Sequence, residues 1–293
     1  MLSERKYIDM KIENYFNWIQ ERHEIYLKRQ QGIKKPWTDD KIFLENKFCN
    51  PFRENDKTTV WFRKNVREPL HNSDEIFLAT VIFRWFNYIP TGEILVQHNL
   101  LETWDAVKAK QVLKNQPKLI TGAYVIKTPD GMNKLDGIIW CINNIYDHKE
   151  KTIDFIKKNR SIKETTNHLT EYPYLGSFMA YEIATDLRHT HLLENATDIM
   201  TWANPGPGAV RGLNRIWQRP LKYKQPENRF ISEMKYLLDA STEYLPCYVP
   251  PMEMRDIEHS LCEFDKYERI RLNEGQSKNK YNGYPEKENA TLW

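Results

Sequence analysis

The sequence is poor in glycine, with only 11 in 293 residues, and it has 15 prolines and four cysteines. Glycine lies well below its average usage of roughly 7%, which argues against doubly wound α/β folds rich in tight turns and against collagen-like or linker sequence. The cysteines are far apart and form no C-x-x-C pair. We therefore expect reduced thiols rather than a disulfide framework or a structural zinc site.

Long hydrophobic runs and several functional motifs are also missing. No apolar run approaches the roughly 20 residues needed to cross a bilayer, and the polar N-terminus lacks the hydrophobic segment of a secretory signal, so we expect a cytoplasmic protein without a membrane partner. The sequence holds no G-x-x-x-x-G-K-[ST], G-x-G-x-x-G, H-E-x-x-H or G-x-S-x-G. His189 and His191 would point about 200° apart on one helix, which excludes a shared metal ion there. The sequence thus requires no cofactor and predicts no metal ligand.

Aromatic residues are abundant instead, with nine Trp, 16 Tyr and 12 Phe, and they predict a core built largely from aromatic side chains. Apolar residues recur at spacings of three and four, which predicts a mainly α protein of about ten helices. Residues 74–88 carry a broad apolar stripe that indicates a buried core helix. Residues 90–92 are interpreted as a turn, and residues 120–126 as a short strand or the start of a helix. Helices are expected at about 11–29, 39–46, 56–65, 74–88, 103–114, 135–147, 151–158, 161–170, 177–190, 209–217, 228–242 and 254–268.

The predicted organisation is a single helical domain over residues 1–275, with two lobes at about 1–115 and 116–275 as the alternative, and a mobile polar tail over 276–293. The net charge of +3 neither demands nor excludes a polyanionic partner. Residues 205–235, however, contain seven Lys and Arg but only two Glu. This local excess indicates a surface for a polyanion, and a solvated basic face is the alternative.

Four of the 11 glycines fall between residues 176 and 212, at two sites that each precede a predicted helical pattern. Pro173, Gly176, Ala180 and Ile183 fit the pattern of a helix-hairpin-helix motif. Such a hairpin presents backbone N–H groups at a helix N-terminus, here at Gly176 and Ser177, where a DNA phosphate is bound without side-chain charge. The alternative is an ordinary turn between two helices.

Two further features follow the hairpin. Asp198 lies 22 residues after the hairpin glycine, close to the separation at which helix-hairpin-helix DNA glycosylases place an essential Asp; an N-cap or a surface acid is the alternative. Residues 204–208 then form a Pro/Gly loop that leads into a helix with Arg211 and Arg215 at i,i+4. Both guanidiniums share one face of that helix, an arrangement that suits phosphate or carboxylate binding.

Several sequence blocks between residues 36 and 267 carry a resemblance to a known family. The blocks are 36–40 (PWTDD), 47–53 (KFCNPFR) with Asp56 and Thr59, 83–87 (FRWFN), 121–124 (TGAY), 181–190 (YEIATDLRHT), 201–209 (TWANPGPGA) and 261–267 (LCEFDKY). The sequence resembles the glycosylase-related helical family of α-glutamyl/putrescinyl-thymine pyrophosphorylases, which includes the helical domain of 5-hydroxymethyluracil DNA kinases of phage DNA hypermodification systems. The resemblance implies a helix-hairpin-helix DNA-glycosylase-like fold.

The resemblance also implies a transferase that replaces a phosphorylated or pyrophosphorylated 5-hydroxymethyl group of uracil in DNA with an amino acid or polyamine. Such chemistry needs a flipped base, cations on the departing phosphate and an acid or base for the amine. The implied partners are DNA, an amino acid or polyamine and a separate P-loop DNA kinase, and an ATP-derived activated substrate is compatible with them. A phage-encoded chain would act in the host cytoplasm. The alternatives are a non-catalytic helical module that presents the base to a kinase, and a glycosylase for modified pyrimidines.

The candidate site residues fall into groups by role. The acid–base candidates are Asp186, Asp198 and Glu263. The phosphate or DNA contacts are Gly176, Ser177, Arg188, Gly206, Gly208, Arg211 and Arg215. The base contacts are Asn50, Arg53 and Asn204, because an Asn side chain offers a paired donor and acceptor to a pyrimidine edge. The remaining candidates are Asp265 and Lys266, with a helix-surface charge pair as the alternative.

Overall fold

The computed structural model describes residues 2–122 and 124–275. These residues form 13 α-helices, two short helical turns and no strand, which confirms the mainly α fold. The predicted tail, residues 276–293, lies outside the described residues. None of the described helices is long and apolar enough to span a membrane. The elements are α1 (Leu2–Gln30), α2 (Lys41–Glu45), η1 (Arg53–Asn55), α3 (Lys57–Phe62), η2 (Arg63–Arg67), α4 (Glu75–Phe86), α5 (Ile89–Gln97), α6 (Ala106–Leu113), α7 (Lys134–Tyr146), α8 (Lys149–Asn159), α9 (Ile162–Leu169), α10 (Ser177–Leu187), α11 (Pro207–Ile216), α12 (Glu227–Tyr244) and α13 (Met254–Arg271).

The chain folds into two compact units. Unit 1 contains the described residues up to Asp56 and from Met200 onward, with α1, α2, α11, α12 and α13. Unit 2 contains Lys57–Ile199, with α3 to α10. The chain therefore leaves unit 1 after η1 and returns to it ahead of α11. The expected single domain over 1–275, or two lobes at about 1–115 and 116–275, stays a prediction.

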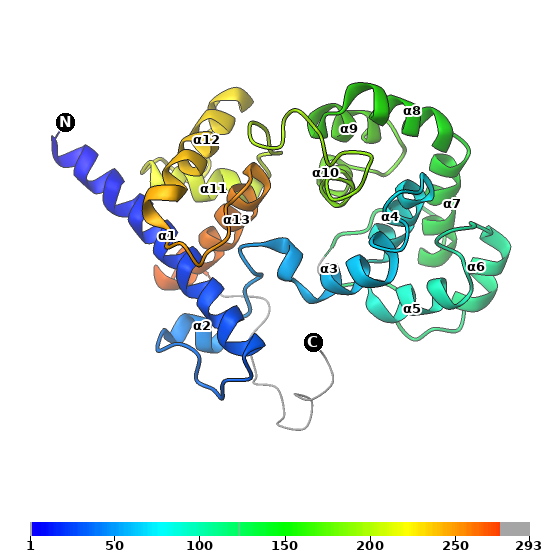
Figure 1. Cartoon of the computed structure of the whole chain (residues 1–293), viewed down its shortest axis with the longest axis horizontal. Coiled ribbons are helices and arrows are strands. Elements are labelled where there is room, and N and C mark those ends of the chain that lie inside the picture. Colours follow the sequence, from blue (N-terminus) through cyan, green and yellow to red (C-terminus); the bar gives the residue numbers. More distant parts are fainter. Residues whose placement is uncertain (1, 123, 276–293) are drawn as a thin grey trace. The chain divides into compact units, whose positions relative to one another are not determined.

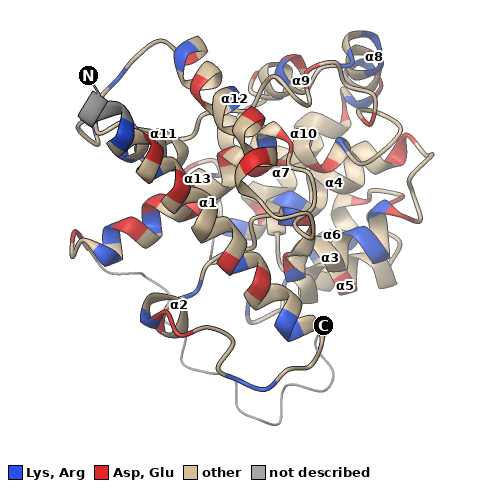
Figure 2. Ribbon diagram, turned by 60° about the vertical axis from the view of Figure 1, so that its left-hand side comes forward, with Lys and Arg blue, Asp and Glu red and all other residues tan. Residues whose placement is uncertain are grey.

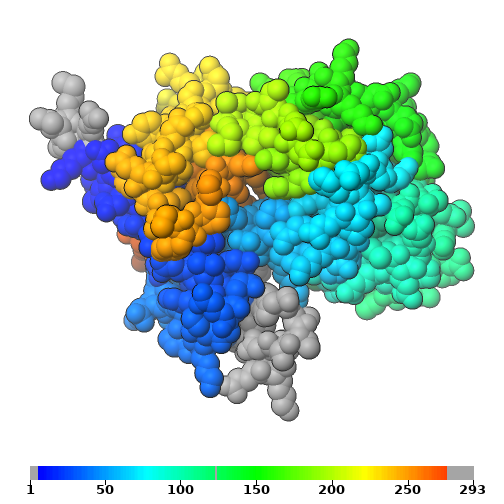
Figure 3. Space-filling model, in the orientation of Figure 1, coloured from blue at the N-terminus to red at the C-terminus, as the bar shows by residue number. Residues whose placement is uncertain are grey.

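Unit 1 is built around α13, which contacts α1, α11 and α12 (Figure 1). Aromatic residues join α1 to α13: the Tyr15 and Phe264 rings lie 5.4 Å apart, and the Tyr15 hydroxyl donates to the Ile257 carbonyl at 3.1 Å. Phe16 stacks on Tyr244 of α12 with 5.1 Å between ring centres. Figure 3 shows α1 (dark blue) beside α12 (yellow to gold) on one face of this unit. Aromatic side chains thus fill the core, as predicted.

Two glycines bring α11 close to α13. A β-carbon on Gly208 would lie 2.2 Å from the Cys262 sulfur, and one on Gly212 would lie 2.4 Å from the Leu261 carbonyl oxygen. These distances are far below van der Waals contact, so any larger residue would push the helices apart. The spacing of four residues places both glycines on the face of α11 that meets α13.

Unit 2 is organised by α4, in which every residue from Ile76 to Phe86 is buried. The predicted buried core helix is therefore confirmed. α10 packs on α4 and on α9. A helix buried on all sides must satisfy any charge that it carries, and α4 carries Arg84.

Residues 90–92 were interpreted as a turn, and this interpretation is wrong: they lie in the first turns of α5. Proline is tolerated at the start of a helix, because the N–H that it lacks would have no partner within the helix. Gly92 is required by packing, since a β-carbon there would lie 2.4 Å from the Trp61 ring. Pro90 thus lies at the start of a helix, and Gly92 allows a close contact with Trp61. Neither residue reverses the chain.

The predicted strand or helix start at residues 120–126 is also wrong. Residues 120–122 and 124–126 adopt neither structure. The Thr121 N–H donates to the Phe86 carbonyl at 3.0 Å, and Ile126 is buried. The segment stays irregular despite its β-prone composition, because the described residues contain no strand with which it could pair. Of its described residues only Ile126 is buried, and Val125 is 83% exposed.

Candidate functional site

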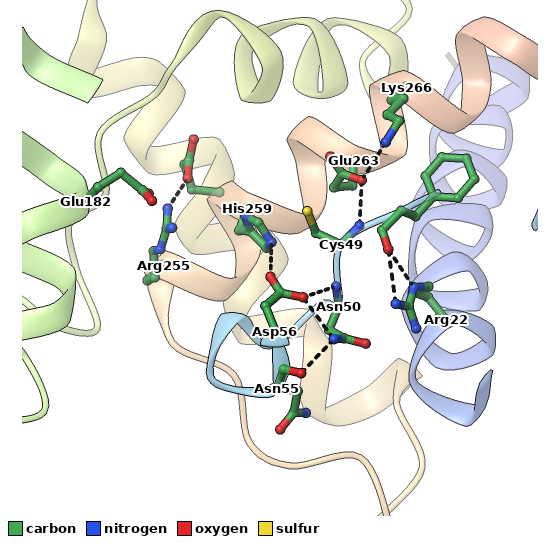
Figure 4. A network of polar contacts seen from close by, with 12 residues as sticks. Arg22, Cys49, Asn50, Asn55, Asp56, Glu182, Arg255, His259, Glu263 and Lys266 are labelled. Carbon is green, nitrogen blue, oxygen red and sulfur yellow. Dashed lines mark hydrogen bonds and ion pairs between the residues drawn. The ribbon is translucent and has the colours of Figure 1, made fainter. Parts of the chain in front are cut away.

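The segment that joins α2 to η1 in unit 1 has no regular structure but is held at successive residues (Figure 4). Arg22 on α1 donates Nε and Nη2 to the Phe48 carbonyl at 3.2 and 3.0 Å. The Cys49 N–H donates to the Glu263 carboxylate on α13 at 2.9 Å. Charged groups from two helices therefore fix the backbone of this loop, which makes its geometry more defined than that of a surface loop.

Asn50 closes the loop onto Asp56. Its backbone N–H and its Nδ2 donate to the same Asp56 oxygen, Oδ1, at 3.0 and 2.9 Å, and Nδ2 also donates to the Asn55 carbonyl at 3.0 Å. Burial raises the pKa of the Asp56 carboxyl to about 6, against the lowering effect of the Asn50 hydrogen bonds and of Arg22 and Arg53. This carboxyl therefore titrates near neutral pH.

Three different ligand types meet beside this loop: the thiol of Cys49, the carboxylate of Asp56 and the imidazole of His259 on α13 (Figure 4). One donor atom from each lies within 4.8 Å of the others. The His259 Nε2 is 4.0 Å from the Asp56 Oδ2. Cys49 is exposed, whereas Asp56 and His259 are half-buried. Burial of the Cys49 sulfur, with Glu263 and Asp56 nearby, raises the pKa of the thiol and so disfavours its action as a nucleophile. The three groups have the chemistry of metal ligands.

Two buried polar atoms near the loop have no hydrogen-bond partner: Oδ1 of Asn50 and Nη1 of Arg22. Both residues are more than nine-tenths buried, at 7% and 6% exposure. Such groups are rare in proteins because each loses its hydration without compensation. Of the donor and acceptor predicted for the Asn50 side chain, the Nδ2 donor is hydrogen-bonded within the loop, and the Oδ1 acceptor has no partner.

Glu263 and Lys266 of α13 contact the same loop. The Lys266 Nζ lies 3.3 Å from the Glu263 carboxylate, donates to the Lys47 carbonyl and sits 4.8 Å from the Phe48 ring centre. The structure therefore brings together Asn50, Glu263 and Lys266 of the predicted set, with Arg53 buried in the adjacent η1.

Arg211 and Arg215 of α11 both bind Asp265. Their Nε atoms lie 2.8 and 2.7 Å from the two carboxylate oxygens, and Arg215 also binds Glu274 at 2.6 Å. Asp265 is 1% exposed, so it is not part of a surface charge pair with Lys266 as in the alternative interpretation. Of the two arginine side chains, Arg215 is 6% exposed and Arg211 is 39% exposed. Only Arg211 has a guanidinium that is readily accessible from solvent.

The Pro/Gly loop ahead of α11 holds the remaining predicted residues of unit 1. Gly206 is the N-cap of α11, and its N–H donates to the half-buried Asn204 carbonyl at 2.7 Å. Gly208 faces Cys262 at the α11–α13 contact. Packing therefore accounts for Gly208, while the backbone at Gly206 stands at a helix N-terminus of the kind that favours anions.

In unit 2, Asp186 on α10 forms a buried ion pair with Arg84 on α4. Arg84 donates Nη2 to Asp186 at 2.7 Å and Nε to its second oxygen, and it donates Nη1 to Asn87 at 2.8 Å. Arg84 is 1% exposed and Asp186 2%. Burial by itself lowers the pKa of Arg84, but the Asp186 carboxylate more than offsets this, and the pKa is raised. Asp186 therefore neutralises the positive charge of Arg84, which α4 places in the core of unit 2.

Asp198 lies at the N-terminus of α9. Its carboxylate accepts from the Ser161 hydroxyl at 2.7 Å and from the N–H groups of Ile162 and Lys163 at 2.8 and 2.9 Å. It therefore satisfies donors that the first turn of a helix leaves without partners. The observed contacts correspond to the capping alternative, in this case for a helix distant in the sequence.

The α9 and α10 helices form a contacting pair joined by the predicted hairpin. Gly176 is the exposed N-cap of α10, Ser177 is its exposed first residue, and a β-carbon on Gly176 would meet no atom within 4 Å. Arg188 ends α10, and its Nη1 donates to the Glu194 carbonyl at 3.4 Å. Since this geometry suits both a helix-hairpin-helix and an ordinary turn, the motif stays a prediction.

Charges of both signs alternate along the helices (Figure 2). Part of the basic excess between residues 205 and 235 is neutralised within unit 1: besides the Asp265 contacts, Arg219 binds Glu233 at 2.6 Å, and Lys235 pairs with Asp239. The cations of this stretch that remain accessible are the exposed Lys222, Lys224 and Arg229, together with the partly exposed Arg211.

Sequence reasoning missed the convergence of Cys49, Asp56 and His259. The first two lie in blocks quoted for the family resemblance, but His259 lies about 200 residues later and had no motif to mark it. A local signal existed on α13, where His259 and Glu263 are one helical turn apart and share a face.

Comparisons with known proteins agree with the resemblance. A family model described as "5-hmdU DNA kinase, helical domain" matches residues 10–277. A protein of Bacillus phage SP10 described as "5-hmdU DNA kinase" is 29% identical over 228 residues, which are 70% of this chain and 36% of the relative. The chain thus spans about a third of that relative's length. No solved structure shows significant similarity. Because the family model covers most of the sequence, the chain belongs to the family of 5-hmdU DNA kinase helical domains.

Proposed function

We propose that this chain binds DNA that contains 5-hydroxymethyluracil and holds the modified base at the loop of residues 47–56. The observation that carries the proposal is the family match over residues 10–277, together with a relative described as a kinase of 5-hmdU DNA. A base inside a duplex is not accessible to a protein side chain at its pairing edge, so the base is flipped out of the stack.

Asn50 and Arg22 supply the hydrogen bonds for the flipped base. The free Oδ1 of Asn50 is an acceptor and the free Nη1 of Arg22 is a donor. A uracil edge offers an N3–H donor beside carbonyl acceptors, whereas a cytosine edge has an acceptor at N3 and an amino donor at C4. We assign Oδ1 of Asn50 to the N3 position of the base, where uracil has a donor and cytosine an acceptor, and in this register the loop favours uracil over cytosine. Both protein atoms are buried, so binding includes a local opening of the loop.

The DNA backbone is bound by a small number of cations and backbone amides. Arg211 uses only Nε for Asp265, which leaves its other N–H groups for a phosphate. Within unit 1, the predicted contact at Gly206 adds an N–H group at the start of α11. Within unit 2, taken by itself, the predicted contacts at Gly176, Ser177 and Arg188 offer N–H groups at the start of α10 and one cation. Binding of this kind weakens as the salt concentration rises.

A transferase reaction is our proposal for the chemistry at the bound base. The amine of an amino acid or polyamine attacks the 5-methylene carbon, the bond from that carbon to the phosphate oxygen breaks, and phosphate or pyrophosphate leaves. Glu263 accepts the proton that the amine loses, and a cation is needed at the leaving group. Arg211 is the predicted cation, but it is bound to Asp265, which lies about 200° around α13 from Glu263, so it would have to leave Asp265 to take this role. Glu263 is favoured for this role because it contacts the same loop as Asn50. Asp186 and Asp198 would first have to give up their present contacts.

A second candidate is a helical module that presents the base to a P-loop kinase. It is favoured by the relative, which is described as a kinase and of which this chain matches 36%. In that case the phosphate comes from ATP bound to the kinase, and this chain supplies DNA binding alone.

Nucleoside analysis by mass spectrometry separates these candidates. The chain is incubated with duplexes that contain 5-hydroxymethyluracil, its phosphate or its pyrophosphate, with and without ATP, glutamate and putrescine. The transferase yields an amine adduct from an activated substrate without ATP. Binding without a product supports the module, and abasic sites support a glycosylase. Failure to bind any of these duplexes more tightly than unmodified DNA contradicts the proposed function.

A further inference from the structure

We propose that Cys49, Asp56 and His259 form a binding site for Zn²⁺ in unit 1. Their donor atoms lie within 4.8 Å of one another, and no other group of three His, Cys, Asp or Glu in residues 2–122 and 124–275 comes this close. The sequence predicted no metal ligand, because the three residues come from a loop and from α13 at opposite ends of the chain. The inference does not depend on the proposed DNA substrate.

The donor set selects the metal. A thiolate and an imidazole suit borderline ions such as Zn²⁺, whereas Mg²⁺ and Ca²⁺ are bound by oxygen atoms. Three protein ligands with a fourth position for water are typical of a zinc site that is open to solvent. The exposed position of Cys49 gives the site access to solvent.

The separation of the ligands agrees with a shared ion. His259 Nε2 and Asp56 Oδ2 are 4.0 Å apart, too far for a hydrogen bond. Two ligands on one tetrahedral Zn²⁺, each about 2.1 Å from it, are roughly 3.4 Å apart. A closure of about half an ångström therefore brings this pair onto one ion.

The surrounding contacts hold the ligands in place. Asn50 donates twice to Oδ1 of Asp56, so the orientation of the carboxylate is fixed and Oδ2 stays on the side of His259 (Figure 4). Glu263 holds the Cys49 N–H, and Arg22 holds the preceding carbonyl. Hydrogen bonds to the groups that carry metal ligands raise the affinity of protein metal sites in this way.

The local charge also favours a divalent cation. The ligand thiolate and carboxylate carry two negative charges, which Zn²⁺ neutralises. Glu263 adds one more negative charge beside Cys49, and Lys266 pairs with Glu263. Arg22 and Arg53 lower the pKa of Asp56, so their charges offset part of this attraction.

Cobalt spectroscopy on the full chain tests the site. The protein is treated with a chelator, the chelator is removed, and Co²⁺ is added under anaerobic conditions. We expect a thiolate-to-Co²⁺ charge-transfer band in the near ultraviolet and visible bands of a tetrahedral ion, which saturate at one equivalent and disappear when Zn²⁺ is added. Saturation without a charge-transfer band, or no binding at one equivalent, overturns the proposal.

Matched variants identify the ligands. Cys49→Ser removes the charge-transfer band, whereas Cys247→Ser, another exposed cysteine of unit 1, retains it. His259→Gln weakens Co²⁺ binding, and Asn50→Ala, which removes only the orienting hydrogen bonds of the side chain, weakens it by about 10- to 100-fold. Far-ultraviolet circular dichroism checks that each variant is folded. A band that survives in Cys49→Ser contradicts the assignment.

DNA binding in the presence of the chelator is measured separately, so that failure of the metal site is distinguishable from failure of the proposed function.

Discussion

Asn50 and Asp56 are joined through a single oxygen atom: Oδ1 of Asp56 accepts from both the backbone N–H and the Nδ2 of Asn50, at 3.0 and 2.9 Å. This leaves Oδ2 of Asp56 beside His259 and leaves Oδ1 of Asn50 without a partner. One amide side chain thus orients a proposed metal ligand and carries the proposed acceptor for the base. Variants at Asn50 should consequently affect both assays, whereas Cys49→Ser should affect metal binding first.

Gly208→Ala should destabilise unit 1. The new methyl group would lie 2.2 Å from the Cys262 sulfur, so α11 and α13 must separate. We expect the free energy of unfolding to fall by about 1–3 kcal/mol in urea denaturation. Gly122→Ala is the matched control, because its methyl group meets no atom within 4 Å and it lies outside the helices. Equal stability of the two variants would contradict the packing role of Gly208.

Asp186→Asn should destabilise unit 2 by about 3–5 kcal/mol, because it leaves the buried Arg84 without its counter-charge. The double variant Arg84→Met with Asp186→Leu should recover part of this loss. Asp239→Asn, in an exposed pair with Lys235, should cost less than about 1 kcal/mol. Thermal and urea unfolding measure all three. An Asp186→Asn protein that is as stable as the wild type but makes no product would instead assign Asp186 to the chemistry.

Asp198→Ala should cost about 1–2 kcal/mol of stability, since three donors at the start of α9 lose their acceptor. Asp198→Asn keeps one acceptor oxygen and should lose less. The product yield per folded molecule should be unchanged in both variants. A folded Asp198→Asn protein without activity would restore the glycosylase-type role that the sequence spacing indicates.

The contrast between α4 and α5 shows how much of the fold was predictable. α4 is buried on all sides, and its long apolar run identifies it without tertiary information. α5 has a proline as its second residue and contains a glycine, and the rings of Trp61 and Phe83, earlier in the chain, explain why glycine is required there. Local patterns thus predicted most helices, but not a helix whose residues are chosen by a distant contact.

The candidate site was predictable to a similar degree. The family resemblance marked Asn50, Arg53 and Glu263, and the structure places Asn50 and Glu263 on either side of Cys49. Arg211 and Arg215 were correctly placed on one face, but their common partner is Asp265 of the same chain. A sequence pattern indicates which side chains share a face of a helix. It does not show whether those side chains are already bound to a residue of the same chain, as both arginines are to Asp265.

Asp256 should make the stability of the chain depend on pH. Burial raises the pKa of this α13 carboxyl to about 7, against the lowering effect of the hydrogen bond that it accepts from the Glu253 N–H. The Glu253 and Glu54 carboxylates add to the rise, and Arg255 opposes it. An unfolded Asp has a pKa of about 3.9. Between these two values the folded state binds more protons than the unfolded state, so the free energy of unfolding falls as the pH rises from about 4 to about 7 and then levels. Asp256→Asn should flatten this dependence in urea denaturation; an unchanged slope would exclude Asp256 as its source.

The most direct test of the central claim compares two modified bases in the same DNA. Duplexes carry a single 5-hydroxymethyluracil or 5-hydroxymethylcytosine opposite an abasic position, so that neither base must be unpaired, and affinity is measured by fluorescence anisotropy at fixed salt. We predict that the wild type prefers the uracil by about tenfold, equivalent to about 1.4 kcal/mol. Asn50→Ala should abolish this preference, and Asn65→Ala, an exposed asparagine of unit 2, should retain it. Equal affinity of the wild type for both duplexes would contradict recognition of the uracil edge by this loop.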